Sequence, residues 1–383
     1  MSDSVRLHFR AFTDLAVSFH VRGASGPVTE HLFGQQFSYT TAAGAGDHSA
    51  DESASAFTRP IGTRPFLTDV EVRASKRVGA VVTIGDSITD GVLSTPGANA
   101  RYPDFLARRL AARGRPRLSV QNAGIGSNRV LSPSGAPWGG PPALERVEDD
   151  VIDQAGVTDV ILMEGTNDIG HSFDPAALAK ASPVVAGLRR LVSRLHAAGI
   201  RVIVGTQLPA KGVSPVGLHG SPPAIAERNK INAWIRRATP GDGVVDFHAA
   251  LRDPADPDRL LPAFDGGDKL HPSDAGYRAM AAAVPLRLLR GPACGPPIRL
   301  RADPRRAVAG ASRRYMFHAT VGRGTRRRPL QRATVWFAGR TLLTGRRGRA
   351  AVTLRLADAG RYPARVSRRG YGRGRATVVV RRP

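Results

Sequence analysis

The sequence lacks several features that define whole classes of protein. Cysteine occurs once, at Cys294, which excludes an intrachain disulfide and a zinc site built from cysteines. No apolar run approaches the roughly 20 residues of a membrane-spanning helix, and one of the longest, 157–163, is interrupted by Asp159. The first ten residues have no apolar signal core. We therefore expect no transmembrane segment and no signal peptide in the chain as written.

Acidic residues are scarce at one end of the chain. Residues 299–383 contain 24 Arg, no Lys and only two acids, Asp303 and Asp358, so this region carries a charge of +22 while the remainder carries +3. The 42 Gly and 29 Pro follow no period, which excludes collagen-like and wholly disordered proteins. The high pI thus belongs to the C-terminal region, and basicity alone is a weak argument for nucleic-acid binding.

The apolar patterns predict four segments. Residues 1–77 show short alternating runs at 17–21, 37–39 and 70–72, which predict a partial β-sandwich region. Residues 78–290 alternate strands and helices and are expected to form an α/β domain. Residues 291–298 read as a Gly/Pro linker. Residues 299–383 contain short β-branched runs between Gly-Arg turns, which predict a small Arg-rich β-sandwich that resembles bacterial immunoglobulin-like modules; a disordered basic tail is the alternative.

Within residues 78–290 the βα units imply a parallel sheet covered by helices on both faces, a three-layer α/β/α fold. Pro183 is expected to kink or split the helical stretch between two of the strands. The expected strands are 81–84, a strand ending at 120, 157–163, 201–205 and 244–247, and the expected helices are 103–112, 142–155, 175–198, 223–237 and 273–289.

Polar residues follow the strands of this predicted sheet. Because ligands gather beyond the carboxyl ends of parallel strands, the loops at those ends are the candidate site. Ser87 stands where a strand gives way to a helix, Asn167 follows another strand, and His271 comes three residues after Asp268. A hydroxyl, a base, a carboxylate that orients the base and an amide donor are what serine-dependent hydrolysis needs. Thr89 stands where a Gly-x-Ser-x-Gly elbow needs its second glycine, which disfavours the usual α/β-hydrolase arrangement.

Three blocks, 85–91 (Gly-Asp-Ser-Ile-Thr-Asp-Gly), 165–168 (Gly-Thr-Asn-Asp) and 268–272 (Asp-Lys-Leu-His-Pro), resemble those of the SGNH or GDSL-type hydrolase superfamily in the same order. The resemblance implies a flavodoxin-like sheet in which Ser87 is the nucleophile, His271 the general base and Asp268 its partner. It also implies an oxyanion hole formed by the backbone N–H groups of Ser87 and Ser127 and the amide of Asn167.

A fourth block departs from the family pattern. The family usually has a glycine where Ser127 stands, and a serine keeps the N–H group but not the freedom of a glycine backbone. Gly126 takes this role if the loop is shifted. Two further residues are candidates for substrate binding: Trp138 could stack on a sugar or acyl group or only pack its loop, and His171 could line the pocket or lie on the surface. No Asp/His cluster has metal-ligand spacing, and we expect no cofactor.

These residues predict a carboxylic-ester hydrolase that works through an acyl-enzyme, with a small ester or an acetylated carbohydrate as substrate. The alternatives are a lipase-like or thioesterase-like acyl hydrolase, or an inactive hydrolase fold that binds acidic polymers. The Arg-rich region is expected to contact an anionic cell-wall polymer; it lacks regularly spaced aromatics, so specific nucleic-acid binding is not indicated.

The chain most resembles bacterial secreted esterases, some of which deacetylate plant polysaccharides and in which a β-sandwich precedes the hydrolase. Residues 14–72 resemble only the later half of such a sandwich. We therefore expect an extracellular protein whose true start lies upstream, and a cytoplasmic one otherwise.

Overall fold

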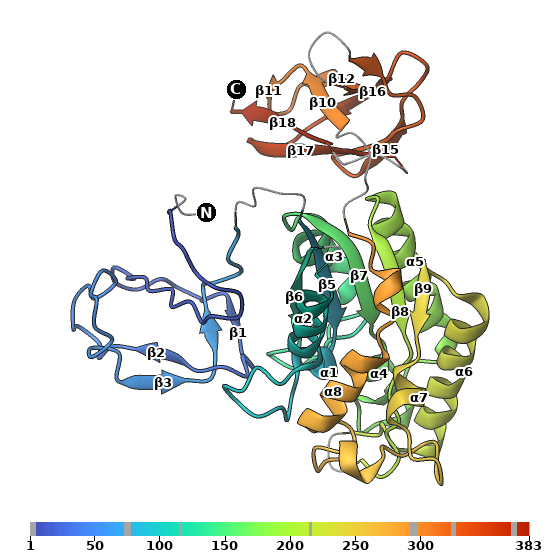
Figure 1. The fold of residues 1–383 in the computed structure, drawn as a ribbon. Coiled ribbons are helices and arrows are strands. Elements are labelled where there is room, and N and C mark those ends of the chain that lie inside the picture. Colours follow the sequence, from blue (N-terminus) through green and yellow to red (C-terminus); the bar gives the residue numbers. More distant parts are fainter. Residues whose placement is uncertain are drawn as a thin grey trace. The chain divides into compact units, whose positions relative to one another are not determined.

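The computed structural model of the chain (Figure 1) describes residues 5–72, 78–114, 117–213, 217–291, 298–322, 327–368 and 374–382. The chain divides into two compact units, Met1–Asp69 and Val70–Pro383. The described part of the first unit contains two antiparallel strand pairs. These are β1 (Glu30–His31) with β4 (Arg64–Pro65), and β2 (Ser38–Thr40) with β3 (Arg59–Ile61).

Two of the strands expected near the N-terminus do not form. Tyr39 lies in β2 as expected, but residues 17–21 and the described residues 70–72 adopt no strand. Val17, Phe19 and Val21 are each more than 40% exposed. An alternating pattern stabilises a strand only when a second strand pairs with it and one face is covered, and neither condition holds at these positions.

A five-stranded parallel sheet forms the centre of the second unit and confirms the expected α/β fold. Its order is β6-β5-β7-β8-β9. In chain order this is 2-1-3-4-5, the order of a doubly wound flavodoxin-like sheet. The strands are β5 (Gly79–Gly85), β6 (Leu118–Gly124), β7 (Val157–Met163), β8 (Arg201–Gly205) and β9 (Gly243–Val245).

Several helices end earlier than their sequence pattern predicts. The stretch 142–155 forms a short helix and a π-helical turn, and 175–198 divides so that Pro183 lies in the first turn of a helix, where its missing N–H costs nothing. The last helix stops before Pro285. The helices are α1 (Ser87–Asp90), α2 (Tyr102–Arg113), α3 (Ala143–Val147), η1 (Glu148–Ile152), α4 (Thr166–Gly170), η2 (Pro175–Ala177), α5 (Ala181–Ala197), α6 (Pro222–Ala238), α7 (Phe247–Leu251), η3 (Pro262–Phe264), α8 (Asp274–Ala283) and η4 (Leu286–Leu288).

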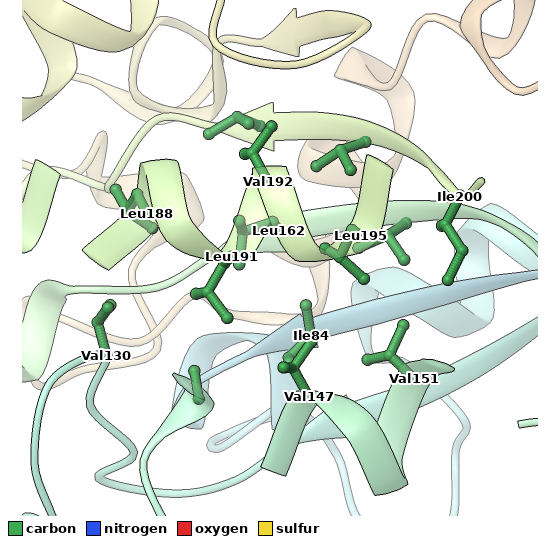
Figure 2. Packing of buried hydrophobic residues seen from close by; sticks show 14 of the residues in the cluster. Ile84, Val130, Val147, Val151, Leu162, Leu188, Leu191, Val192, Leu195 and Ile200 are labelled. Carbon is green, nitrogen blue, oxygen red and sulfur yellow. The ribbon is translucent and has the colours of Figure 1, made fainter. Parts of the chain in front are cut away.

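Alternate residues of the strands enter two separate cores, one on each face of the sheet. Ile84 and Leu162 point into the core that α3, α5 and α6 cover, where Figure 2 shows them beside Val147 and Leu191. Their neighbour Ile161 points into the opposite core, which α2, α7 and α8 cover. Each fully buried aliphatic side chain contributes about 1.5–3 kcal/mol to folding, so the sheet is held firmly from both sides.

The sheet order fixes the place of the ligand site. The strands β5 and β7 are neighbours, yet the chain visits β6 between them, so their connections leave in opposite directions. A crevice forms at the carboxyl ends of such strands. Ser87 follows β5 and Asn167 follows β7, so both candidate residues emerge at this point.

The C-terminal strands form two sheets around one core, as expected of a β-rich region. Phe317 from one sheet meets Phe337 from the other with ring centroids 4.9 Å apart. The expected linker falls mostly on residues 292–297, which lie outside the described residues. The strands are β10 (Ile298–Asp303), β11 (Arg306–Val308), β12 (Ser312–Val321), β13 (Arg328–Pro329), β14 (Thr334–Phe337), β15 (Arg340–Leu343), β16 (Arg349–Arg355), β17 (Gly360–Ser367) and β18 (Gly374–Arg381).

Candidate active site

Ser87 is the first residue of α1, immediately beyond β5. Asp86 caps this helix, because its Oδ1 accepts a hydrogen bond of 3.0 Å from the Ile88 N–H. The turn before it is very tight: a Cβ on Gly85 would lie 2.0 Å from Thr89 Oγ1. Only glycine fits there, and the strand can therefore pass directly into the helix that carries Ser87.

His271 and Asp268 complete a hydrogen-bonded chain that ends at the Ser87 hydroxyl. His271 Nε2 lies 2.8 Å from Ser87 Oγ, although the two residues are 184 positions apart. On the other side of the ring, Nδ1 lies 2.6 Å from Asp268 Oδ2. His271 is 5% exposed. The three residues expected to act together are thus brought together in the order hydroxyl, imidazole, carboxylate.

The carboxylate of Asp268 is held in its charged form. Its Oδ1 accepts two backbone hydrogen bonds, from Leu270 at 2.9 Å and His271 at 2.8 Å. Partial burial acts to raise its pKa, but these bonds and the His271 ring outweigh burial and lower the pKa of Asp268 to about 2. A carboxylate that stays ionised in this position fixes the imidazole so that Nε2 faces the serine.

Ser127 adopts the backbone conformation that the family pattern assigns to glycine. Its φ is +59°, in the left-handed region that favours glycine. The assignment of the oxyanion N–H to Ser127 and not to Gly126 stays a prediction. Ser127 Oγ accepts a hydrogen bond of 3.1 Å from Nε1 of Trp138. A left-handed conformation costs a non-glycine residue roughly 1–2 kcal/mol, and the bond to Trp138 offsets part of that cost.

Asn167 connects the β7 loop to the loop that contains Ser127. Its Nδ2 donates to the backbone oxygen of Asn128 at 2.9 Å. One amide hydrogen is then committed and the second remains for an acceptor in the site. The β6 loop is tied in turn to β5, because the Ile125 N–H donates to Gly85 O at 3.0 Å. These bonds hold the loops that carry Ser87, Ser127 and Asn167 close together.

Trp138 and His171 lie at the edges of this region. The Trp138 indole is 41% exposed beside Ser127. The His171 N–H bonds to Asn167 O at 3.2 Å, and its ring centroid lies 6.2 Å from that of His219. Partial burial, helped by Arg129, lowers the pKa of His171. Among the described residues no group of three or more His, Cys, Asp or Glu side chains could hold a metal.

Arg146, on α3, is a buried support that the sequence analysis missed. All five of its N–H groups donate hydrogen bonds, at 2.7 to 3.1 Å. Nε donates to Asn128 Oδ1, and Nη1 donates to Ala123 O and Asp150 Oδ2. Nη2 donates to Gly85 O and Glu164 Oε1. Apart from Asp150 on η1, its acceptors lie in the last two residues of β5 and β6 or in the loops that directly follow β6 and β7. One guanidinium therefore holds the three loops that form the site in a fixed arrangement.

Three buried carboxyl groups surround the base of the site. Burial is the main cause that raises the pKa of Asp86 and of Asp168 to about 6. Burial, together with the charge of Asp86, also raises the pKa of Glu164 well above its ordinary range, although Arg146 acts in the opposite direction. Asp168 supports the β6 loop, because it accepts bonds from Val130 N at 2.8 Å and Leu131 N at 3.1 Å.

His219 is a second residue that the sequence analysis missed. It is 4% exposed, and its Nε2 lies 3.1 Å from Asn167 Oδ1. It belongs to the loop that follows β8, and a search of every strand-end loop for polar side chains would have included it. Arg146 lies four residues before Asp150, on the side of the predicted helix opposite Leu144, Val147 and Val151, so its place in the sequence does not indicate burial.

Comparison with known proteins gives one family. The profile of the GDSL-like Lipase/Acylhydrolase family matches residues 83–279, about half of the chain. No curated protein matches the chain significantly. Among solved structures, the chain is similar to a G-D-S-L family lipolytic protein from Desulfitobacterium hafniense (20% identity, 53% of this chain and 96% of the other, TM-score 0.40). It is also similar to a carbohydrate acetylesterase from Sinorhizobium meliloti (16%, 54% and 95%, TM-score 0.42).

A third similar structure is a variant of an acetyl-xylooligosaccharide esterase from Geobacillus (25%, 55% and 94%, TM-score 0.41). The family match spans Ser87, Asn167, Asp268 and His271, the four residues that the sequence blocks single out and whose side chains bond as described above. The chain belongs to the GDSL-like lipase/acylhydrolase family and is a hydrolase of ester bonds.

Proposed function

We propose that the protein cleaves small carboxylic esters through an acyl-enzyme on Ser87, and that acetylated carbohydrates are its substrates. The observation that carries the proposal is the chain from Ser87 Oγ through His271 to Asp268, with contacts of 2.8 and 2.6 Å. A serine hydroxyl is a weak nucleophile until a neighbouring base takes its proton. The imidazole lies within the distance that this proton transfer needs.

In the first half of the reaction, Ser87 Oγ attacks the ester carbonyl while its proton passes to His271 Nε2. The negative oxygen that forms is stabilised by the N–H groups of Ser87 and Ser127 and by the second amide hydrogen of Asn167. The intermediate then collapses, His271 returns the proton to the departing alcohol oxygen, and the acyl group stays on Ser87. In the second half, water gives a proton to His271 and attacks the acyl carbon. The bond from the acyl carbon to Ser87 Oγ then breaks, His271 returns the proton to Ser87 Oγ, and the acid is released.

Trp138 supports a carbohydrate ester as the substrate. Its indole is 41% exposed and is joined to Ser127, so an aromatic face lies next to the proposed oxyanion hole. A partly exposed indole offers an apolar surface on which a sugar ring can stack. A long acyl chain gains instead from a continuous apolar groove.

Hydrolysis of p-nitrophenyl esters from acetate to decanoate, beside acetylated xylo-oligosaccharides and acyl-thioesters, tests this proposal. We expect the highest kcat/KM with acetyl esters and a further gain with acetylated sugars. A preference for long chains or thioesters would favour the lipase-like or thioesterase-like alternative. No turnover of any ester would favour an inactive fold.

The Arg-rich C-terminal region supports a second proposal, that it attaches the enzyme to an anionic polysaccharide. Strands β10, β12 and β16 are adjacent, and their core-facing residues alternate with outward basic residues. The register places Arg301 opposite His318 and His318 opposite Arg349, which forms a basic row across three strands. Guanidinium groups bind carboxylate and phosphate in two-point contacts. The outward basic residues are Arg299, Arg301, Arg314, His318, Arg349 and Arg355.

An extracellular location agrees with a polysaccharide ester as substrate, and it stays a prediction. Among the described helices none is long and apolar enough to cross a membrane.

A further inference from the structure

Asn167 is held at both ends of its side-chain amide. Nδ2 donates to Asn128 O at 2.9 Å, and Oδ1 faces His219 Nε2 at 3.1 Å. Asn167 and His219 are each 4% exposed, so water does not replace either contact easily. Because an amide oxygen can only accept a hydrogen bond, Nε2 of His219 must carry the hydrogen.

The loop that delivers His219 is built for close approach to α4. The Leu218 N–H donates to Gly170 O at 2.8 Å and to Ser172 O at 3.0 Å. A Cβ on Gly170 would lie 2.4 Å from Cδ2 of His219, and a Cβ on Gly217, whose φ is +92°, would lie 2.7 Å from Gly170 O. Side chains at either glycine would displace the loop, so the sequence makes room for the imidazole against α4.

We propose that His219 is a positioning residue, which holds the Asn167 carboxamide so that its Nδ2 faces the oxyanion. The inference rests on the proposed function. Rotation about the last torsion of an asparagine side chain has two broad minima that exchange O and N. The exchanged orientation would point Oδ1, a partial negative charge, at the developing oxyanion. The His219 N–H disfavours that orientation, because it would then face an N–H group instead of an acceptor.

The size of the expected effect follows from what each residue does. Loss of a whole oxyanion donor costs about 10² to 10³ in kcat. Loss of one neutral hydrogen bond that orients the donor is worth roughly one factor of ten. Substrate binding in the ground state does not use the oxyanion donor, so the effect belongs in kcat and not in KM.

The variant His219→Phe keeps the ring and removes the donor. We expect kcat for p-nitrophenyl acetate to fall about tenfold and KM to stay within about twofold. His219→Gln, which retains a donor, should recover part of the loss. His196→Phe is the matched control, since His196 lies on the surface of α5 and pairs with Asp242 at 2.9 Å; its kcat should equal that of the parent.

The decisive comparison repeats His219→Phe in an Asn167→Ala background. If His219 acts only through the amide, it has nothing left to position, and the second substitution should change kcat by less than about twofold. A further tenfold fall in that background would show that His219 supports the loop in general, and would overturn the inference. If Asn167→Ala itself leaves kcat unchanged, the oxyanion assignment in the proposed function fails instead.

A measurement on the unaltered protein covers the case in which His219→Phe does not fold. Nitrogen NMR of histidine-labelled protein near neutral pH distinguishes the two imidazole tautomers. We expect the His219 signals to show hydrogen on Nε2. Hydrogen on Nδ1 alone would leave no donor toward Asn167 and would contradict the proposal.

Discussion

Removal of the Arg146 guanidinium should destabilise the α/β domain more than loss of an ordinary surface ion pair. Arg146 is 4% exposed and all five of its N–H groups are bonded. Arg146→Met keeps the length of the side chain and removes every donor. Breaking a buried ion pair from one side costs about 3–5 kcal/mol, because the partner, here Glu164, stays buried without its counter-charge.

The loss should depend on pH, and the sign follows from Glu164. Burial already raises the pKa of Glu164, and Arg146 opposes that rise. Without Arg146 the folded-state pKa of Glu164 moves still higher. A group with a raised folded-state pKa loses stability as the pH rises through that value. The loss of unfolding free energy in Arg146→Met, relative to the parent, should therefore increase with pH. The increase should reach about 1.4 kcal/mol per pH unit between the folded-state pKa of Glu164 in the parent and its folded-state pKa in the variant.

Urea denaturation followed by tryptophan fluorescence measures this effect. A Trp336→Phe background removes the reporter in β14 and leaves Trp138 and Trp234, both in the α/β domain. Arg146→Met combined with Glu164→Gln should be more stable than Arg146→Met alone, because the unpaired carboxyl is gone. A loss below about 1 kcal/mol, or one that is independent of pH and of Glu164, would refute the reasoning.

Three further perturbations address the helix cap, the Ser127 loop and the basic strands. Burial raises the pKa of Asp86 to about 6, so the protonated carboxyl stabilises the fold at low pH and this stability is lost as the pH rises through 6. Asp86→Asn keeps the helix cap but cannot ionise, so it should remove up to about 3 kcal/mol of that loss. Urea stability profiles of parent and variant that run parallel from pH 4 to pH 8 would contradict this. Ser127→Gly retains the N–H and relieves the left-handed φ of +59°, so kcat should stay within a few-fold, whereas Ser127→Pro, which cannot adopt that φ and lacks the donor, should lose about 10² or more. Replacement of Arg299, Arg301 and Arg349 by Gln should weaken retention on a polygalacturonate column and the salt dependence of that retention, while turnover of small esters stays unchanged. The control variant has Gln at Arg313, Arg332 and Arg340, which lie off this face. Equal retention of the two triple variants, or preferential binding of DNA by the parent, would count against the anchoring proposal.

The sequence predicts the α/β domain well because its signals are local and agree with one another. The short, β-branched apolar runs at 157–163 and 201–205 indicate buried strands, and the blocks around Ser87 and Asn167 follow strands whose ends a parallel sheet aligns. The errors arise where a local pattern needs a distant partner. Residues 17–21 alternate as a strand does, but no strand of the described residues pairs with them, and they remain exposed.

The supporting residues of the site were not predictable in the same way. His219 is 52 positions from Asn167, and its proposed role depends on a close approach of its loop to α4 that Gly170 and Gly217 permit. Arg146 reads as a charged residue in a helix, which is normally exposed. Only the positions of its acceptors, on three different strand ends, make its burial favourable.

Covalent capture of the acyl group on Ser87 tests the central claim most directly. Short incubation with p-nitrophenyl acetate, acid quenching and peptide mass spectrometry should find an acetyl group on the peptide that contains Ser87. Ser87→Ala should show neither the adduct nor turnover above about a thousandth of the parent rate, with the fold retained by circular dichroism. Full turnover by Ser87→Ala, or an acetyl group on another residue during turnover, would contradict the account.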